Sequence, residues 1–196
     1  NPKIDEKENA LKTIRHKYFT VTTRKEKLAL QKEDKKLRKE ISDLLKNDGF
    51  QTDVAEKIAI FNLFEQNTST EWFDPEWMFG VTDGFDIVIG NPPFISTKGI
   101  DAETKKQLEK SFGFADDAYN HFFFKAIQLL RENGILTYIT SKTYWTIQTK
   151  KNLRELLLKN TILQIFDTAN PFENAMVDTG VVIAKKATPQ SAHKVV

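Results

Sequence analysis

The chain has 196 residues, of which 40% are hydrophobic and 29% charged, and its formal net charge is +2. This length and composition are typical of a soluble globular protein with one domain and room for an appendage. The sequence contains no cysteine, which excludes a disulfide framework and a thiolate metal site. It shows neither an apolar run long enough to cross a membrane nor a signal-peptide pattern, so a cytoplasmic protein without a membrane partner is expected.

The charge is unevenly distributed along the chain. Residues 1–50 carry 14 lysines and arginines against 9 acidic residues, whereas the remainder carries 15 against 18. A domain that binds DNA by itself needs a concentrated basic face. If the chain acts on DNA, most of the phosphate contacts are therefore expected from elsewhere.

Residues 1–66 are predicted to form a helical hairpin. Apolar residues recur at helical spacing among lysines and glutamates, and Asn47-Asp48-Gly49 supplies a stop. A second helix is expected with Asp53 as its cap and with an apolar stripe at Val54, Ile58, Phe61 and Phe64. For this arm we favour an ordinary solvated charged face over a contact with nucleic acid. The polar and aromatic segment that follows, residues 67–84, is expected to clamp a loop to the core.

A short β-strand is predicted at residues 85–90 because Ile87, Val88 and Ile89 form a β-branched apolar run. Such a run is typical of a strand covered on both faces, as in a parallel sheet. Gly90 and the two prolines after it end the strand, since proline cannot donate to a β-ladder.

The end of this strand offers hydrogen-bond acceptors and few donors. Asn91 has a side-chain oxygen, and Pro92 and Pro93 have carbonyl groups but no N–H. Phe94 adds a flat aromatic face. Two acceptors beside a stacking ring suit a planar group that bears an exocyclic NH2, and ligands of open α/β sheets bind at the carboxyl ends of the strands.

The rest of the chain reads as alternating helices and strands. Helices are expected from Asp101 to Lys110, from Asp116 or Asp117 to Asn133-Gly134, and over residues 147–160. Strands are expected at residues 135–140, 162–166 and 181–184. The strand, helix and strand around the second of these helices should form a parallel βαβ unit. For His121 we favour a packing role over a metal or general-base role, because no second ligand lies at metal spacing.

Two stretches of the sequence resemble a known family. Asn91-Pro92-Pro93-Phe94 resembles the (Asn/Asp/Ser)-Pro-Pro-(Tyr/Phe/Trp) motif of amino-group methyltransferases. Residues 73–80 and 84–94 resemble the adenine-specific methyltransferase part of Eco57I-like, type IIG restriction-modification enzymes. Further matches to that family are Asp117, Tyr119 and Phe122 on one helix and Phe172 before the last strand. The proline that the family carries after its next strand is replaced here by Ser141-Lys142.

The resemblance implies an α/β fold with part of a Rossmann-like methyltransferase sheet. Four strands would match the fourth to seventh strands of the family sheet, mostly parallel with an antiparallel last strand, after an N-terminal helical hairpin. The implied division is a helical arm at residues 1–66, the catalytic half of a class I methyltransferase at 67–185 and a linker at 186–196.

The resemblance also implies an activity: transfer of a methyl group from S-adenosylmethionine to adenine N6 in double-stranded DNA, within a restriction-modification enzyme. The adenine would be flipped out of the duplex. Asn91, Pro92, Pro93 and Phe94 would then be catalytic. Phe172 and Tyr119 would bind the base, and Asn91 and Asp117 would contact the cofactor.

One part of the family pattern is missing. S-adenosylmethionine sites of this kind use a glycine-rich turn, yet the eight glycines here include no Gly-x-Gly. The chain, which begins without methionine, is therefore expected to be a piece that lacks the cofactor-binding half and the target-recognition domain of a longer parent, and to be inactive by itself. The alternatives are a protein-glutamine or ribosomal-RNA methyltransferase, which share the Asn-Pro-Pro motif, and a non-catalytic docking module.

Overall fold

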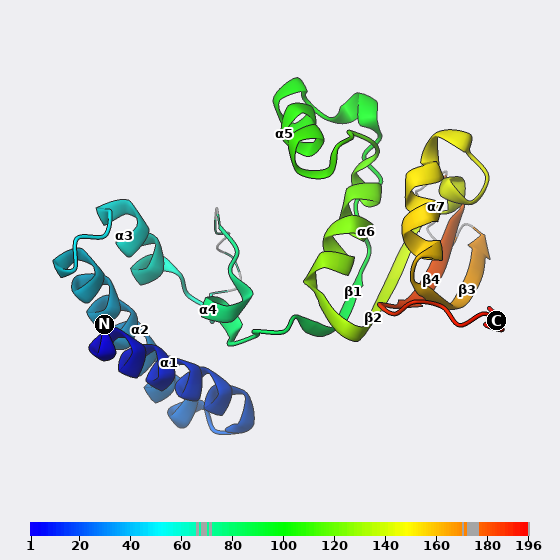
Figure 1. Ribbon diagram of the computed structural model, residues 1–196. Coiled ribbons are helices and arrows are strands. Elements are labelled where there is room, and N and C mark those ends of the chain that lie inside the picture. Colours follow the sequence, from blue (N-terminus) through cyan, green and yellow to red (C-terminus); the bar gives the residue numbers. More distant parts are fainter. Residues whose placement is uncertain (66, 68–69, 71, 170, 172–176, 196) are drawn as a thin grey trace. The chain divides into compact units, whose positions relative to one another are not determined.

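The computed structural model describes residues 1–65, 67, 70, 72–169, 171 and 177–195. The chain forms two compact units, Asn1–Thr82 and Asp83–Val196 (Figure 1). None of the helices in the described ranges combines the length and the apolar character needed to cross a bilayer.

The first unit is helical. Its helices are α1 (Pro2–Thr20), α2 (Arg24–Asn47), α3 (Thr52–Ile60) and α4 (Pro75–Phe79). The prediction of N-terminal helices is confirmed, and the expected pair corresponds to α2 and α3, which pack together. The break that separates α1 from α2 was not predicted. Helices α1 and α2 lie side by side and are joined by a three-residue turn (Figure 1). Side chains cap both of them: Asn1 accepts a hydrogen bond from the amide of Lys3, and Thr23 accepts one from the amide of Glu26.

A buried charge network connects the helices of this unit. Asp34 is fully buried and accepts hydrogen bonds from Arg15 Nε at 3.0 Å and from Arg38 Nε at 2.7 Å. Arg15 Nη1 also donates to the carbonyl oxygens of Trp77 and Met78, at 2.6 and 3.0 Å. The network thus joins α1, α2 and α4 through charged side chains. From the spacing of apolar residues alone, such side chains would be expected to face the solvent.

Two details of the predicted arm are wrong. The N-cap of α3 is Gln51, and Asp53 lies inside the first turn; the helix ends at Ile60, so Phe64 lies beyond it. Phe61 stays buried after the helix end because its ring meets those of Trp72 and Trp77, with centroids 5.9 and 5.6 Å apart. The aromatic segment at 72–79 therefore packs within the helical unit.

The second unit contains a four-stranded mixed sheet. Its strands are β1 (Phe85–Gly90), β2 (Leu130–Ser141), β3 (Thr161–Ala169) and β4 (Thr179–Lys185), in the spatial order β1-β2-β4-β3. Strands β1 and β2 pair in parallel, and β4 runs antiparallel to both of its neighbours. The predicted α/β class, the parallel βαβ unit and the antiparallel last strand are confirmed. The last strand lies inside the sheet, between β2 and β3.

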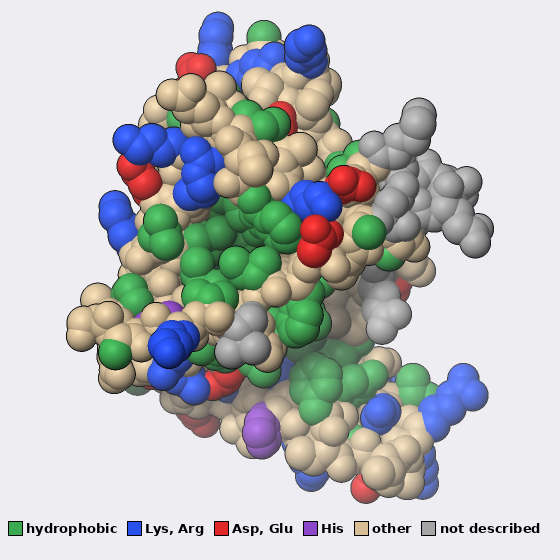
Figure 2. All heavy atoms as spheres, turned by 90° about the vertical axis from the view of Figure 1, so that its right-hand side faces the viewer, with side chains coloured by type: hydrophobic (Ala, Val, Ile, Leu, Met, Phe, Trp, Pro, Cys, Tyr) green, Lys and Arg blue, Asp and Glu red, His purple; other side chains and the backbone are tan. Residues whose placement is uncertain are grey.

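Three helices belong to this unit: α5 (Ala102–Phe112), α6 (Ala118–Leu129) and α7 (Lys151–Leu158). Short 3-10 turns lie at Thr97–Gly99, Lys142–Trp145 and Gln148–Lys150. Helices α6 and α7 pack on the sheet around a core that contains Phe123, Leu136, Leu153 and Val182. On the face shown in Figure 2, apolar side chains also gather near α7 and β3, where Leu158, Ile165 and Phe166 are exposed.

The expectation that β1 is covered on both faces is wrong. Val88 packs against the core, but Ile87 and Ile89 on the opposite face are 64% and 76% exposed. The strand also lies at the edge of the sheet, with β2 as its only neighbour in the described part of the chain. The apolar run therefore predicts burial correctly for only one face of the strand.

Two helix boundaries also differ from the predictions. Helix α6 ends at Leu129, and Asn133 lies within β2 with a φ of 64°, where its backbone amide donates to the carbonyl oxygen of Lys186 at 2.9 Å. The helix expected over 147–160 is a 3-10 turn followed by the shorter α7. The predicted cap Asp101 is confirmed, since its carboxylate accepts from the amide of Thr104 at 2.8 Å.

Candidate active site

The end of β1 leaves the sheet with free acceptors. Gly90 is the last paired residue, opposite Tyr138 of β2. The side chain of Asn91 is exposed and Pro92 is buried. Among the described residues, neither the amide group of Asn91 nor the carbonyl oxygen of Pro92 takes part in a hydrogen bond. The side chain of Asn91 is thus available to a ligand, whereas the carbonyl oxygen of Pro92 is unpaired but belongs to a buried residue.

An open pocket of about 530 Å³ lies at this edge of the sheet. It collects side chains from four places in the sequence, because the parallel strands β1 and β2 end side by side and the start of α6 and of β4 meet them there. The lining residues are Phe94, Ile95, Ser96, Asp117, Tyr119, Ser141, Thr143, Val177 and Asp178.

The pocket brings together three of the residues predicted from the sequence: Phe94, Asp117 and Tyr119. Asn91 and Pro92 are not among its lining residues, and Pro93 borders a second, more apolar cavity of about 320 Å³ next to α5 and α6. Phe172 lies outside the described residues. The segment that follows it reaches the pocket through Val177 and Asp178.

Hydroxyl groups form one wall of the pocket. The phenol oxygen of Tyr119 lies 3.0 Å from Thr143 Oγ1, to which Ser141 Oγ also donates at 3.0 Å. Burial raises the pKa of Tyr119, so its phenol stays protonated at neutral pH. This wall is polar and uncharged, which suits a neutral heterocycle that carries donors and acceptors.

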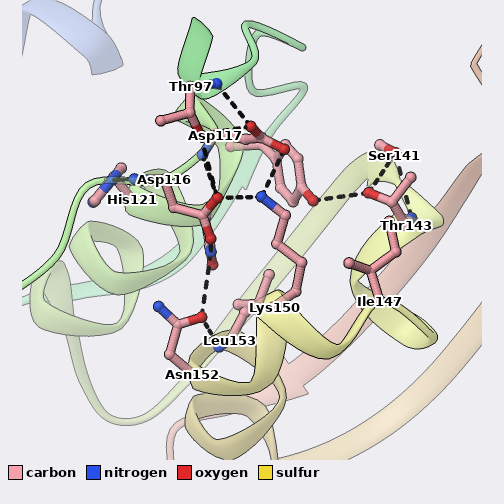
Figure 3. Close-up of polar contacts among 12 residues, drawn as sticks. Thr97, Asp116, Asp117, His121, Ser141, Thr143, Ile147, Lys150, Asn152 and Leu153 are labelled. Carbon is pink, nitrogen blue, oxygen red and sulfur yellow. Dashed lines mark hydrogen bonds and ion pairs between the residues drawn. The ribbon is translucent and has the colours of Figure 1, made fainter. Parts of the chain in front are cut away.

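Asp117 lies at the N-cap of α6, but its carboxylate does not cap that helix. Instead Oδ1 accepts hydrogen bonds from the amide and the hydroxyl group of Thr97, at 2.8 and 3.0 Å, and Oδ2 accepts one from Lys150 Nζ at 2.7 Å (Figure 3). The predicted capping role is therefore wrong for Asp117, because tertiary partners occupy both oxygens. Lys150 Nζ also donates to Asp116 Oδ1.

Asp117 and Lys150 are both charged at neutral pH. Burial acts to raise the pKa of Asp117, but hydrogen bonds from Lys150 and Thr97 outweigh it and hold that pKa below its ordinary value. Burial acts to lower the pKa of Lys150, yet hydrogen bonds to Asp116 and Asp117 bring it above the ordinary value. Both shifts favour the charged forms.

His121 has a packing role, as the sequence suggests. Its Nε2 accepts a hydrogen bond from the amide of Asp116 at 2.9 Å, and its ring stacks on Phe114 with centroids 4.7 Å apart. Burial lowers the pKa of His121, which keeps the ring neutral. Within the described ranges, no group of three or more histidine, cysteine or acidic side chains could hold a metal ion.

Sequence reasoning missed Thr97, Ser141, Thr143 and Lys150. They stand singly and belong to no motif. Ser141 and Thr143 had one usable signal, since polar residues directly after a buried strand mark the carboxyl edge of a sheet. Lys150 had no such signal, because a lysine next to another lysine in a predicted helix is expected to be exposed to solvent.

Comparison with known proteins places the chain among restriction-modification methylases. Residues 8–173 match the family described as Eco57I restriction-modification methylase. The chain is 31% identical over 111 residues to the type II restriction enzyme and methyltransferase RM.Eco57I of Escherichia coli, covering 52% of the chain and 11% of that protein. It is 24% identical over 117 residues to the type II methyltransferase M.VspI of Vibrio sp., covering 59% and 28%.

A solved structure also resembles the chain. It is a class I S-adenosylmethionine-dependent methyltransferase, described as putative, from Listeria monocytogenes, with 15% identity and a TM-score of 0.46 over 59% of this chain and 37% of that one. The chain thus spans only a part of each of these proteins. Because the family match extends over most of its length, the chain belongs to the Eco57I restriction-modification methylase family.

Proposed function

We propose that this chain is the catalytic part of a DNA methyltransferase that methylates adenine N6. The observation that supports this most directly is the strand end: Asn91 and Pro92 offer unpaired acceptors, and Phe94, three residues further, lines a pocket of about 530 Å³ with the buried Tyr119. A flipped adenine would enter that pocket and stack on Phe94. Tyr119 would lie against the base, and Phe172 is proposed as a second aromatic contact.

The proposed chemistry lies in how the amine is held. The lone pair of the adenine amino group is delocalised into the ring, which makes the nitrogen a poor nucleophile. Asn91 Oδ1 and the Pro92 carbonyl would accept its two N–H bonds and so localise the pair on nitrogen. These hydrogen bonds strengthen as positive charge develops on the nitrogen, and they therefore stabilise the transition state more than the ground state.

S-adenosylmethionine supplies an electrophilic methyl group when it is bound. Of the two residues predicted to contact it, Asn91 fits, because its side chain is exposed and unpaired. Asp117 does not fit as well, because Thr97 and Lys150 already occupy both carboxylate oxygens. We propose that the remaining cofactor contacts, and the reading of the DNA sequence, come from other parts of a longer parent protein.

The substrate class can be tested with the natural full-length protein that carries this chain. It is incubated with a radiolabelled methyl donor and with duplex DNA, ribosomal RNA or protein, and the products are digested and separated. Label in N6-methyldeoxyadenosine is the expected result. Label in RNA or in glutamine would replace the proposal by one of the other methyltransferase functions, and no transfer to any substrate would favour a docking module.

Asn91→Ala in the same protein should lower kcat for methyl transfer by about 10²- to 10³-fold, the range for removal of one transition-state hydrogen bond. Folding should be unaffected because the side chain is exposed. Asn47→Ala, which also removes an exposed asparagine, is the matched control and should leave kcat unchanged. Full activity of Asn91→Ala would exclude this residue from the chemistry.

A further inference from the structure

Lys150 is a buried ammonium group behind the candidate active site. The residue is 6% exposed, and its Nζ contacts a carboxylate oxygen of both Asp116 and Asp117. The three side chains converge between the 3-10 turn at Gln148–Lys150 and the start of α6 (Figure 3). In the described part of the chain, no other lysine or arginine forms an ion pair with either carboxylate.

The cluster is connected to the loop that carries Phe94. Asp117 Oδ1 holds Thr97 through the backbone amide and the hydroxyl group. One residue further, the amide of Ala118 donates to the carbonyl oxygen of Ile95 at 2.9 Å. Residues 95–97 are therefore fastened at both ends to the start of α6, and Phe94 leads directly into them.

The fastening depends on charge balance. Asp116 and Asp117 are adjacent carboxylates that are mostly withdrawn from water, with side chains 15% and 22% exposed. The other titratable groups nearby, Tyr119 and His121 on α6, have pKa shifts that favour their neutral forms. The only positive charge that meets the two carboxylates in the described residues is that of Lys150. Without it, two like charges would share a partly dry site, which is unfavourable.

We propose that Lys150 is a positioning residue for the methyl transfer: it neutralises the Asp116–Asp117 pair, and Asp117 then holds the loop 94–97 so that Phe94 keeps its place in the pocket. The inference rests on the proposed function for its catalytic consequence only. Its structural step, from Lys150 through Asp117 to Thr97, can be measured without any activity.

The structural step is tested by proteolysis of the natural full-length protein. Lys98 is exposed and follows the fastened segment, so tryptic cleavage after Lys98, followed by mass spectrometry, reports how firmly the loop is held. Lys150→Met should accelerate this cleavage severalfold, and so should Asp117→Asn, which weakens the acceptor and keeps the lysine. Lys151→Met is the matched control, because Lys151 is the next residue and its side chain is 74% exposed. Equal cleavage in Lys150→Met and Lys151→Met would overturn the proposal.

The charge argument predicts a rescue that a purely packing role would not show. In Lys150→Met, replacing Asp116 by asparagine as well removes the surplus negative charge, so Lys150→Met/Asp116→Asn should recover part of the lost protection at Lys98. If the double variant recovers no protection, the neutralising role is wrong.

The catalytic consequence is tested by steady-state methyl transfer to DNA. Lys150→Met should lower kcat by about 10- to 100-fold, because a small displacement of a positioning group is costly. KM for DNA should change little, since Lys150 is 6% exposed and its ammonium group is taken up by Asp116 and Asp117. Lys150→Arg keeps the charge and should retain more activity than Lys150→Met.

The outcomes separate the two proposals. If the unaltered protein transfers no methyl group to adenine, the proposed function fails, while cleavage at Lys98 still decides the role of Lys150. If adenine is methylated and Lys150→Met keeps the kcat of Lys151→Met, the positioning role fails and the proposed function stands. If Lys150→Met does not fold, as judged by circular dichroism, the variants Asp117→Asn and Lys150→Arg decide in its place.

Discussion

Asn91 and Asp117 show how differently two polar residues at one sheet edge are used. Asn91 is exposed and its side chain has no partner among the described residues, as expected of a group that binds a ligand. Asp117 lines the same edge, but its oxygens bond to Thr97 and Lys150. In the function proposed above, the chemistry and the support of the site would thus be carried by different side chains.

The ionisation of Asp117 predicts a pH dependence of stability. Its pKa in the folded chain lies below the ordinary value, so its contribution is fully present above the unfolded pKa and is lost as the pH falls through the folded pKa. Asp117→Asn should therefore lower the melting temperature at pH 7, and the difference from the unaltered chain should shrink as the pH approaches 3. A difference that stays constant from pH 7 to pH 3 would contradict this linkage.

Asp34 is the centre of the buried charge network of the helical unit. Its carboxylate is fully buried between two arginines, and removing it leaves two guanidinium groups without their partner. Asp34→Ala should lower the free energy of unfolding by about 3–5 kcal/mol, measured by urea denaturation. Glu56→Ala, which removes the exposed Lys46–Glu56 pair, should cost less than about 1 kcal/mol. Similar losses in the two variants would mean that the buried network contributes no more than a surface pair.

At the scale of elements, the turn that leads into β1 requires a glycine for two reasons. Gly84 has a φ of +98°, and a Cβ there would lie 2.6 Å from the amide nitrogen of Arg131 and 2.8 Å from the carbonyl oxygen of Leu129. A side chain would thus meet both an unfavourable backbone conformation and the rigid start of β2.

Gly84→Ala should therefore destabilise the chain by more than the roughly 1 kcal/mol expected from the conformation alone. Gly113→Ala is the matched control, since Gly113 has a φ of +81° with nothing within 4 Å of its Cβ position. The difference between the two variants in urea denaturation isolates the close approach of β1 to β2. Equal losses would mean that the backbone shifts at little cost.

At the scale of the whole molecule, the chain spans a small share of its relatives. It covers 11% of RM.Eco57I and 28% of M.VspI, and it has no Gly-x-Gly sequence. The exposed Ile87 and Ile89 lie on the strand that leads to the Asn-Pro-Pro-Phe motif.

We therefore expect this 196-residue chain by itself to bind S-adenosylmethionine weakly or not at all. A thermal-shift titration with the cofactor should show no stabilisation at micromolar concentrations, because stabilisation grows as RT ln(1 + L/Kd), where L is the free ligand concentration, and is negligible far below the dissociation constant. Micromolar binding would contradict this expectation.

Local chemistry determined much of this protein. The β-branched run and the prolines after it predict β1 and its end, and the spacing of apolar residues predicts the alternation of helices and strands. The antiparallel direction of β4 was implied by the family resemblance alone. The Asn-Pro-Pro-Phe motif points to the family that the comparison then showed. These features are readable because each depends on the conformational limits of a few adjacent residues.

Only the tertiary structure decided which side chains are buried and which residues they contact. It placed Asp34 in the core, left Ile87 and Ile89 exposed, and brought Lys150 to Asp116 and Asp117 across more than thirty positions of sequence. The physical reason is that burial and ion pairing depend on neighbours that are distant in the sequence, and the pattern around a lysine in a charged helix is the same whether its ammonium group faces water or a carboxylate.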